Sequence, residues 1–161
     1  MLLIGCTQGD RSNLIDAQVT RVVSGQTVEV VLSSSATTAK VRIIGIDAPD
    51  LRQSPWGKTA QDELAKLIMG LSVQLELESD GNLELARDRY HRIHAHLWQN
   101  NSLISQQLVQ AGCVLANTEY PHLYSKLLKD GQEYARLLEY GVWNPKQPLR
   151  YTPNQFRSKN Q

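Results

Sequence analysis

Three segments rich in β-branched residues follow one another in the first third of this chain, before any helical pattern appears. Residues 18–23 and 26–32 are separated by a single Ser-Gly pair, which predicts two strands joined by a tight turn. Residues 40–47 predict a third strand, and Gly45 within it marks a bend. The fold therefore begins with three consecutive strands.

Helical and strand patterns alternate in the rest of the chain. Residues 54–70 predict a helix, because a Ser-Pro pair at its start is followed by apolar residues at helical spacing. Further strands are predicted at 73–77 and 90–98, and further helices at 101–111 and 121–140. The order of three strands, a helix, two strands and two helices is that of an α+β fold, a five-stranded OB-fold β-barrel with about three flanking α-helices.

The size and composition of the chain fit one domain with its own hydrophobic core. The chain has 161 residues, of which 41% are hydrophobic. We expect an N-terminal segment over residues 1–14, the barrel domain over 15–143 and a basic tail over 144–161. No apolar run approaches the roughly 20 residues of a membrane-spanning helix. We predict a monomer without a transmembrane segment.

Charge is distributed unevenly along the sequence. The net charge of +1 argues against a strongly basic coat for nucleic acid. However, the residues after 145 include four basic and no acidic side chains, whereas residues 1–145 carry a net charge of −3. The tail is either a solvated end or a source of non-specific affinity for phosphate.

Two cysteines are too few for a disulfide framework. Cys113 lies in an apolar stretch and is expected to be a small buried side chain. Residues 3–6, Leu-Ile-Gly-Cys, resemble the lipobox at which bacterial lipoproteins are lipidated, which predicts a lipid anchor at Cys6 in a secreted or envelope-anchored bacterial protein. Only five residues precede Cys6, so either a leader is truncated or the match is accidental and the protein is cytoplasmic.

Two polar clusters have the chemistry that phosphodiester cleavage requires. Asp47 and Asp50 flank Pro49 after the third predicted strand, and carboxylates on a rigid turn suit a hard cation such as Ca²⁺. Residues 86–92 contain three arginines, which can bind phosphate, and Tyr90, which can stack on a base. Together the two clusters would activate a water molecule, stabilise negative charge on the phosphate and bind the nucleotide.

Each cluster also has a simpler interpretation. Taken alone, Asp47 and Asp50 are more often a solvated turn, and the arginines an exposed charged face. The histidines His91, His94 and His96 resemble a metal cluster. On a strand, however, His91 would face away from the other two, which favours surface histidines.

Four motifs in order along the chain resemble the staphylococcal-nuclease-like (thermonuclease) family. They are residues 41–50, Gln-Ser-Pro-Trp-Gly at 53–57, Asp-Arg-Tyr-His-Arg at 88–92 and Leu-Val-Gln-Ala-Gly at 108–112. The resemblance covers about residues 17–143. It implies an OB-fold and calcium-dependent hydrolysis of single-stranded DNA and RNA.

The resemblance also implies roles for nine residues. These are the catalytic Arg42, Arg92 and Asp50, with Asp50 at the position of the proposed general base; the metal ligands Asp47, Gln26 and the backbone oxygen of Ala48; and the nucleic-acid contacts Arg89, Tyr90 and Tyr120.

Departures from the family pattern bear on the metal site. Gln26 stands where Asp is usual and offers a neutral amide oxygen, and Asp50 stands where Glu is usual and is one methylene shorter. Ala48 replaces threonine, and His91 replaces glycine. We therefore expect weaker calcium binding or use of another divalent cation. The alternative is a degenerate OB-fold module that binds nucleic acid without cleaving it, and a weaker third is a secreted interaction domain.

Overall fold

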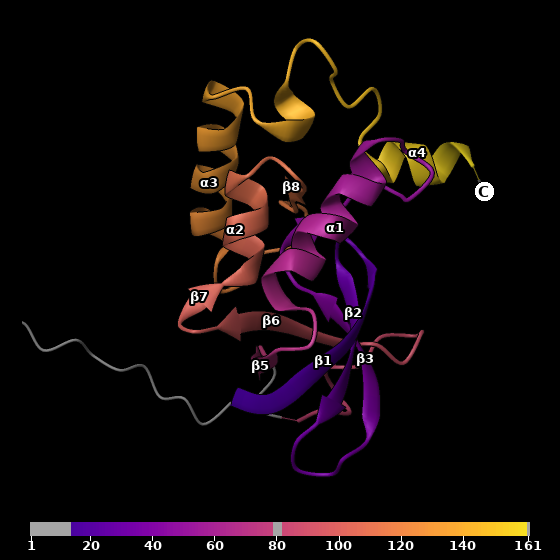
Figure 1. Ribbon diagram of the computed structural model, residues 1–161, viewed down its shortest axis with the longest axis vertical. Helices are drawn as coiled ribbons and strands as arrows, with labels where there is room; N and C mark the ends of the chain where they lie inside the picture. Colours follow the sequence, from indigo (N-terminus) through magenta and orange to yellow (C-terminus); the bar gives the residue numbers. More distant parts are fainter. Residues whose placement is uncertain (1–13, 79–81, 161) are drawn as a thin grey trace, which may run out of the picture.

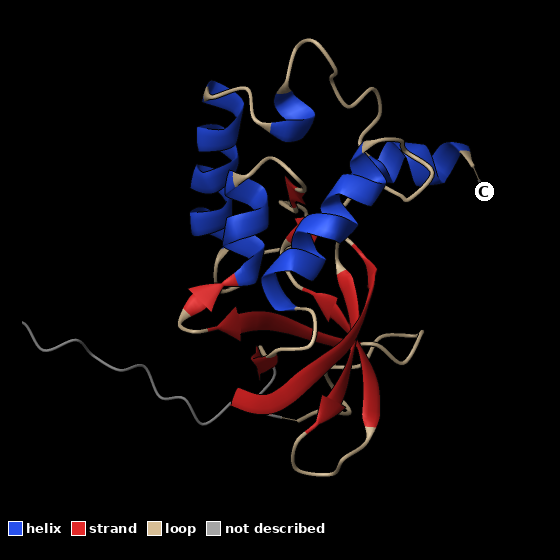
Figure 2. Cartoon of the chain, viewed as in Figure 1, coloured by secondary structure: helices blue, strands red, loops and turns tan. Residues whose placement is uncertain are grey.

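The computed structural model describes residues 14–78 and 82–160 (Figures 1 and 2). Cys6 lies outside these residues, so its lipidation stays a prediction. The helices are α1 (Trp56–Ile68), α2 (Ile104–Gln110), α3 (Ser125–Leu137), α4 (Pro153–Lys159) and the 3₁₀ turn η1 (Gly141–Trp143). No helix in the described part of the chain is long and apolar enough to cross a membrane.

Five strands form a closed barrel, which confirms the predicted α+β OB-fold (Figure 2). They are β1 (Leu14–Ser24), β2 (Thr27–Leu32), β3 (Thr38–Ile43), β5 (Ser72–Glu76) and β6 (Ile93–Gln99). The sheet order is β3-β2-β1-β5-β6, extended by β7 (Ser102–Leu103), and a parallel pairing between β3 and β6 closes the barrel. A separate small sheet pairs β4 (Ile46–Asp47) with β8 (Leu115–Ala116).

The core fills the barrel and continues under α1. Alternate residues of the strands point inward, so that Val28, Val30 and Val41 are fully buried. Helix α1 adds Leu64 and Ile68 from one face, and both are also fully buried. At about 25 cal/mol per Å² of apolar surface, this continuous core is the main favourable contribution to folding.

Three predicted elements begin later than their sequence patterns indicate, because local hydrogen bonds compete with them. The strand predicted at 90–98 begins at Ile93, since the preceding residues form a turn around the Asp88 carboxylate. The helix predicted at 101–111 begins at Ile104 because β7 first pairs with β6. The helix predicted at 121–140 begins at Ser125, whose hydroxyl accepts from the backbone N–H of His122.

The basic tail contains a helix that the sequence analysis did not predict. Thr152 caps α4 in a reciprocal capping box with Gln155, and Pro153 stands at its first turn. Helix α4 lies beside the N-terminal end of α1 (Figure 1), where the Gln53 side chain donates to the Tyr151 carbonyl at 2.9 Å. The end of the chain is therefore packed against the turn that follows β4.

Candidate functional site

The bend between β3 and β4 positions Arg42. Gly45 has a φ of +83°, and a Cβ there would lie 2.6 Å from the His122 ring, so both the backbone and the space favour glycine. The Arg42 guanidinium donates to the carbonyls of Ile43 and Ile46, the second at 2.7 Å. Burial lowers the pKa of Arg42 to about 10, partly offset by Asp47, so the guanidinium stays protonated at neutral pH.

Asp88 holds the second predicted catalytic arginine. Its carboxylate accepts from the backbone N–H groups of Tyr90 and Arg92 at 2.9 and 3.0 Å, from Arg92 Nε at 2.9 Å, and pairs with His94 Nε2 at 3.0 Å. Burial opposes ionisation of Asp88, but these hydrogen bonds outweigh it and hold its pKa well below the usual range. Asp88 thus fixes the direction of the Arg92 side chain.

The two predicted catalytic arginines belong to one site. The parallel pairing of β3 with β6 places Arg42 opposite His94, which pairs with the same carboxylate as Arg92. The charge of Arg92 also contributes to the lowered pKa of Arg42. Two guanidinium groups, one on β3 and one in the turn before β6, therefore converge on one region, as an incoming phosphate would require.

Asp50 lies between the β4 turn and α1 and is paired with Arg52. Arg52 Nε donates to Asp50 Oδ1 at 2.9 Å and Arg52 Nη2 to Oδ2 at 3.1 Å. The hydrogen bond from the Arg52 guanidinium lowers the pKa of Asp50, which keeps the carboxylate ionised at neutral pH. Such a carboxylate is a weak proton acceptor but can orient a water molecule.

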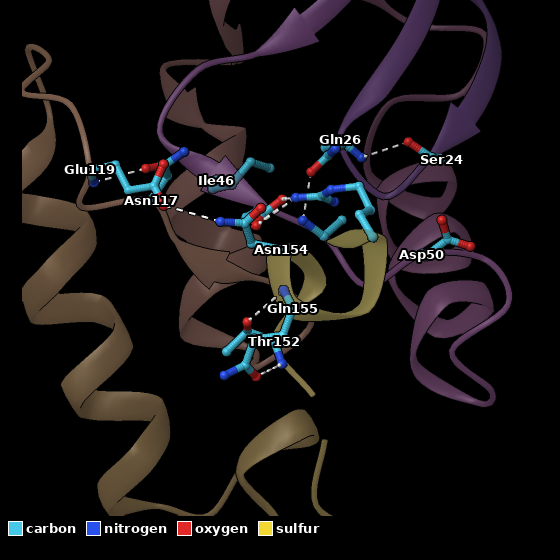
Figure 3. Close-up of polar contacts among 12 residues, drawn as sticks. Ser24, Gln26, Ile46, Asp50, Asn117, Glu119, Thr152, Asn154 and Gln155 are labelled. Atoms are coloured by element: carbon cyan, nitrogen blue, oxygen red, sulfur yellow. Dashed lines mark hydrogen bonds and ion pairs between the residues drawn. The ribbon is translucent and has the colours of Figure 1, made fainter. Parts of the chain in front are cut away.

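The predicted metal ligands offer the right donor type but are engaged by protein groups. Gln26 Oε1 accepts from the Ala48 backbone N–H at 2.6 Å (Figure 3). Both Asp47 oxygens contact a single nitrogen, Arg157 Nη2, at 2.8 and 3.0 Å. Carboxylate, amide and carbonyl oxygens fit a hard divalent cation, and Arg157 must leave Asp47 before a cation can bind both carboxylate oxygens.

A cavity of about 570 Å³ extends from Arg42, within the usual size of a ligand pocket. Tyr120 lines it together with Arg42 and Arg87, so the structure places Tyr120 and Arg42 on the same cavity. Tyr90 does not line this cavity. Its side chain is exposed to solvent. The guanidinium carbons of Arg89 and Arg92 lie 4.8 and 5.4 Å from the centre of its ring.

A second cluster, Glu78, His96 and His122, places its ligand atoms within 4.8 Å of one another and is a candidate metal-binding triad. The expectation that His96 is a surface residue is wrong, because its side chain is fully buried and pairs with Glu78 at 2.7 Å. His91, in contrast, is exposed in the turn before β6, and His94 is partly exposed. No sequence motif indicates this triad, since Glu78 and His122 lie far along the chain from the histidines of β6.

Burial lowers the pKa of His96, which is fully buried, and of His122, which is half-buried, and Glu78 acts in the opposite direction. His122 Nδ1 accepts from the Tyr124 backbone N–H at 3.2 Å, which places the proton of the neutral ring on Nε2. Among the residues that the structure describes, neither that Nε2 atom nor His96 Nδ1 has a hydrogen-bond partner, and both atoms are buried. A metal bound at His122 Nε2 would therefore require the proton to leave that atom.

Comparison with known proteins places these features in a family. The model of the family "Staphylococcal nuclease homologue" matches residues 40–145. An uncharacterized 38.1 kDa protein of Capnoides sempervirens is 29% identical over 152 residues, which cover 92% of this chain and 41% of the relative. An uncharacterized endonuclease of Escherichia coli is 29% identical over 136 residues, covering 84% of this chain and 81% of the relative.

The staphylococcal-like nuclease CAN1 of Arabidopsis thaliana is 28% identical over 137 residues, which cover 83% of this chain and 38% of that protein. The chain thus spans less than half the length of two of these three relatives. The family match covers well over half of the chain and contains both catalytic-site arginines predicted from the motifs. The resemblance is confirmed, and the chain belongs to the staphylococcal nuclease homologue family.

Proposed function

We propose that the protein is an endonuclease that hydrolyses phosphodiester bonds of single-stranded DNA and RNA with a divalent cation, preferentially Ca²⁺. The observation that carries this proposal is the proximity of Arg42 to Arg92, which Asp88 holds in place, next to a cavity that both Arg42 and Asp88 line. Relatives named as endonucleases support hydrolysis. The donor set at the β4 turn supports a hard cation.

Each part of the proposed site has a separate role. Arg42 and Arg92 would donate to the phosphate oxygens on which negative charge grows as water attacks phosphorus. Asp50, held ionised by Arg52, would accept a hydrogen bond from that water and orient it. A cation held by Asp47 would supply further positive charge on the phosphate. Tyr120 would stack on a base in the cavity, which suits single strands with exposed bases.

A digestion assay tests this proposal directly. Single-stranded DNA, single-stranded RNA and duplex DNA are incubated with the protein in Ca²⁺, Mg²⁺, Mn²⁺ or EDTA. We expect cleavage of the single strands that is greatest in Ca²⁺ and abolished by EDTA. Arg42→Ala should lower kcat by roughly 10²–10³, because it removes a charge donor to the transition state. Arg21→Ala is the matched control, since Arg21 is exposed on β1 and pairs with Glu29.

The outcomes separate nuclease from binding module. Cleavage that resists EDTA would contradict the metal requirement. Binding of single strands without cleavage in any metal would favour the degenerate OB-fold module. An equal decrease in kcat in Arg42→Ala and Arg21→Ala would show that Arg42 contributes only to the net positive charge of the protein.

A further inference from the structure

A side chain of the C-terminal arm (residues 144–160) occupies the carboxylate that a metal would use. Arg157 Nη2 lies 2.8 Å from one oxygen of Asp47 and 3.0 Å from the other. One positively charged nitrogen shared by both oxygens occupies the same side of the carboxylate as a cation bound to both would. Arg157 and such a cation therefore compete for Asp47.

The arm is docked by several contacts besides this ion pair. Gln53 binds the Tyr151 carbonyl at 2.9 Å, and the Arg52 guanidinium carbon lies 5.3 Å from the centre of the Phe156 ring. Pro153 is buried at the start of α4. Figure 3 shows α4, with Asn154 and Gln155, packed against the segment that carries Ile46. The position of Arg157 is thus set by the fold of the arm.

The charge of Arg157 reaches the other residues of the site. It contributes to the lowered pKa of Arg42 and of Asp50, so it lies within the field of both. The side chains of Arg157 and Asp47 are 38% and 17% exposed, respectively. A partly exposed pair of this kind is weak enough to open reversibly. Helix α4 also lies beyond residues 40–145, which match the family.

We propose that the C-terminal arm is an autoinhibitory element that blocks the metal site. In the docked arm, Arg157 neutralises Asp47 and takes the place of the divalent cation. Cation binding requires Arg157 to leave, and release of the arm therefore accompanies loading of the site. This proposal rests on the metal-dependent activity proposed above, and it adds a regulation that the arm exerts on that same site.

Calcium titration calorimetry at low ionic strength tests the competition, with Asp47→Asn as the baseline for binding elsewhere. Arg157→Gln removes the competing charge and should tighten the apparent Kd for Ca²⁺ by about threefold to tenfold. Lys159→Gln is the matched control, because it removes the same charge from the same helix but Lys159 lies over the Tyr151 ring. We expect Lys159→Gln to stay within about twofold of the parent.

Hydrogen exchange of the parent gives a second readout that does not depend on cleavage. Saturating Ca²⁺ should speed amide exchange in residues 153–159 as the arm is released, and should not change exchange in α2. Equal calcium affinity in Arg157→Gln and Lys159→Gln, with unchanged exchange in α4, would overturn the arm proposal and leave the nuclease proposal intact.

The remaining outcomes also decide between the two proposals. If Arg157→Gln binds Ca²⁺ more tightly but no variant cleaves nucleic acid, the autoinhibition proposal is supported and the nuclease proposal is overturned. Loss of cleavage in Arg157→Gln with unchanged Ca²⁺ binding would overturn the arm, because Arg157 would then serve the substrate. If calorimetry detects no Ca²⁺ binding that depends on Asp47, the proposal about the C-terminal arm is wrong. The digestion assay with and without EDTA then tests the nuclease proposal separately.

Discussion

Asp88 positions Arg92 and the turn that carries it through hydrogen bonds to its carboxylate. Four donors converge on its carboxylate, three from the turn that leads into β6 and the fourth from His94 within β6. Because charged acceptors form the stronger hydrogen bonds, the turn is held closed and Arg92 is held in place. Asp88 is a positioning residue, whereas Arg42 and Arg92 are the groups that would touch the phosphate.

A substitution at Gln26 tests whether its side-chain oxygen belongs to the proposed metal site. Gln26→Asp would replace a neutral amide by a carboxylate beside Asp47, and we expect the apparent Ca²⁺ affinity to rise about tenfold, or roughly 1.4 kcal/mol. The shorter side chain would also weaken the bond to the Ala48 N–H, which should cost about 1 kcal/mol of unfolding free energy. Calorimetry and urea unfolding measure the two effects.

The control for this substitution is Gln26→Asn, which has the same length as Asp but no charge. It should lose the same stability and gain no calcium affinity. If both variants bind Ca²⁺ as the parent does, Gln26 does not face the metal, and the assignment carried over from the family is wrong at this position.

At the level of elements, a glycine sets how closely α1 approaches the loop that carries Asp50. A Cβ on Gly57 would overlap the Asp50 carbonyl oxygen and lie 2.6 Å from Leu51 Cα. Gly57→Ala should therefore push this loop away, lower the unfolding free energy by about 1–3 kcal/mol and reduce kcat through displacement of Asp50. Urea unfolding and single-strand digestion report the two changes.

A matched substitution lies in the middle of α3. A Cβ on Gly131 would meet the flexible Gln110 side chain at 3.2 Å and Val109 Cγ1 at an ordinary contact distance of 3.6 Å, so Gly131→Ala should keep full activity and change stability by less than about 1 kcal/mol. If Gly57→Ala behaves in the same way, the close approach of α1 does not position Asp50.

The elements show why part of the site could be predicted from the sequence. Arg42, Asp47 and Asp50 lie within ten residues on a strand end and its turn, so local sequence places them together. The closing pairing of β3 with β6, which brings Arg92 to Arg42, is a long-range contact for which the OB-fold resemblance was needed. The barrel itself is predicted by the order of the strands and helices along the chain.

Other parts of the site are formed by contacts that no nearby sequence pattern predicts. Arg157 reaches Asp47 across 110 residues, and the charge pattern of the tail, which predicts a solvated end or affinity for phosphate, does not show where a short helix docks. The alternation along the strand predicts a surface position for His96 and does not reveal its pairing with Glu78 or its proximity to His122. In both cases the tertiary contacts override the local pattern.

At the level of the whole molecule, the interior histidines link the stability of the barrel to pH. Burial lowers the pKa of His96 and His122 from the value of 6.5 for a free side chain, although Glu78 and, for His96, Glu76 oppose the shift. The folded chain therefore binds fewer protons than the unfolded chain just below this pH. These groups leave the unfolding free energy unchanged above about pH 7.5, and they lower it as the pH drops through about 6.5.

His122→Gln tests this linkage, because glutamine keeps an acceptor for the Tyr124 N–H but cannot become charged. Urea unfolding of the parent should lose stability between pH 7.5 and 5.5, and the loss should be smaller in His122→Gln. His91→Gln removes an exposed histidine and should lose stability as the parent does. If His122→Gln follows the parent's pH profile instead, the half-buried imidazole of His122 does not resist protonation in the folded chain, and the decline must arise from other groups.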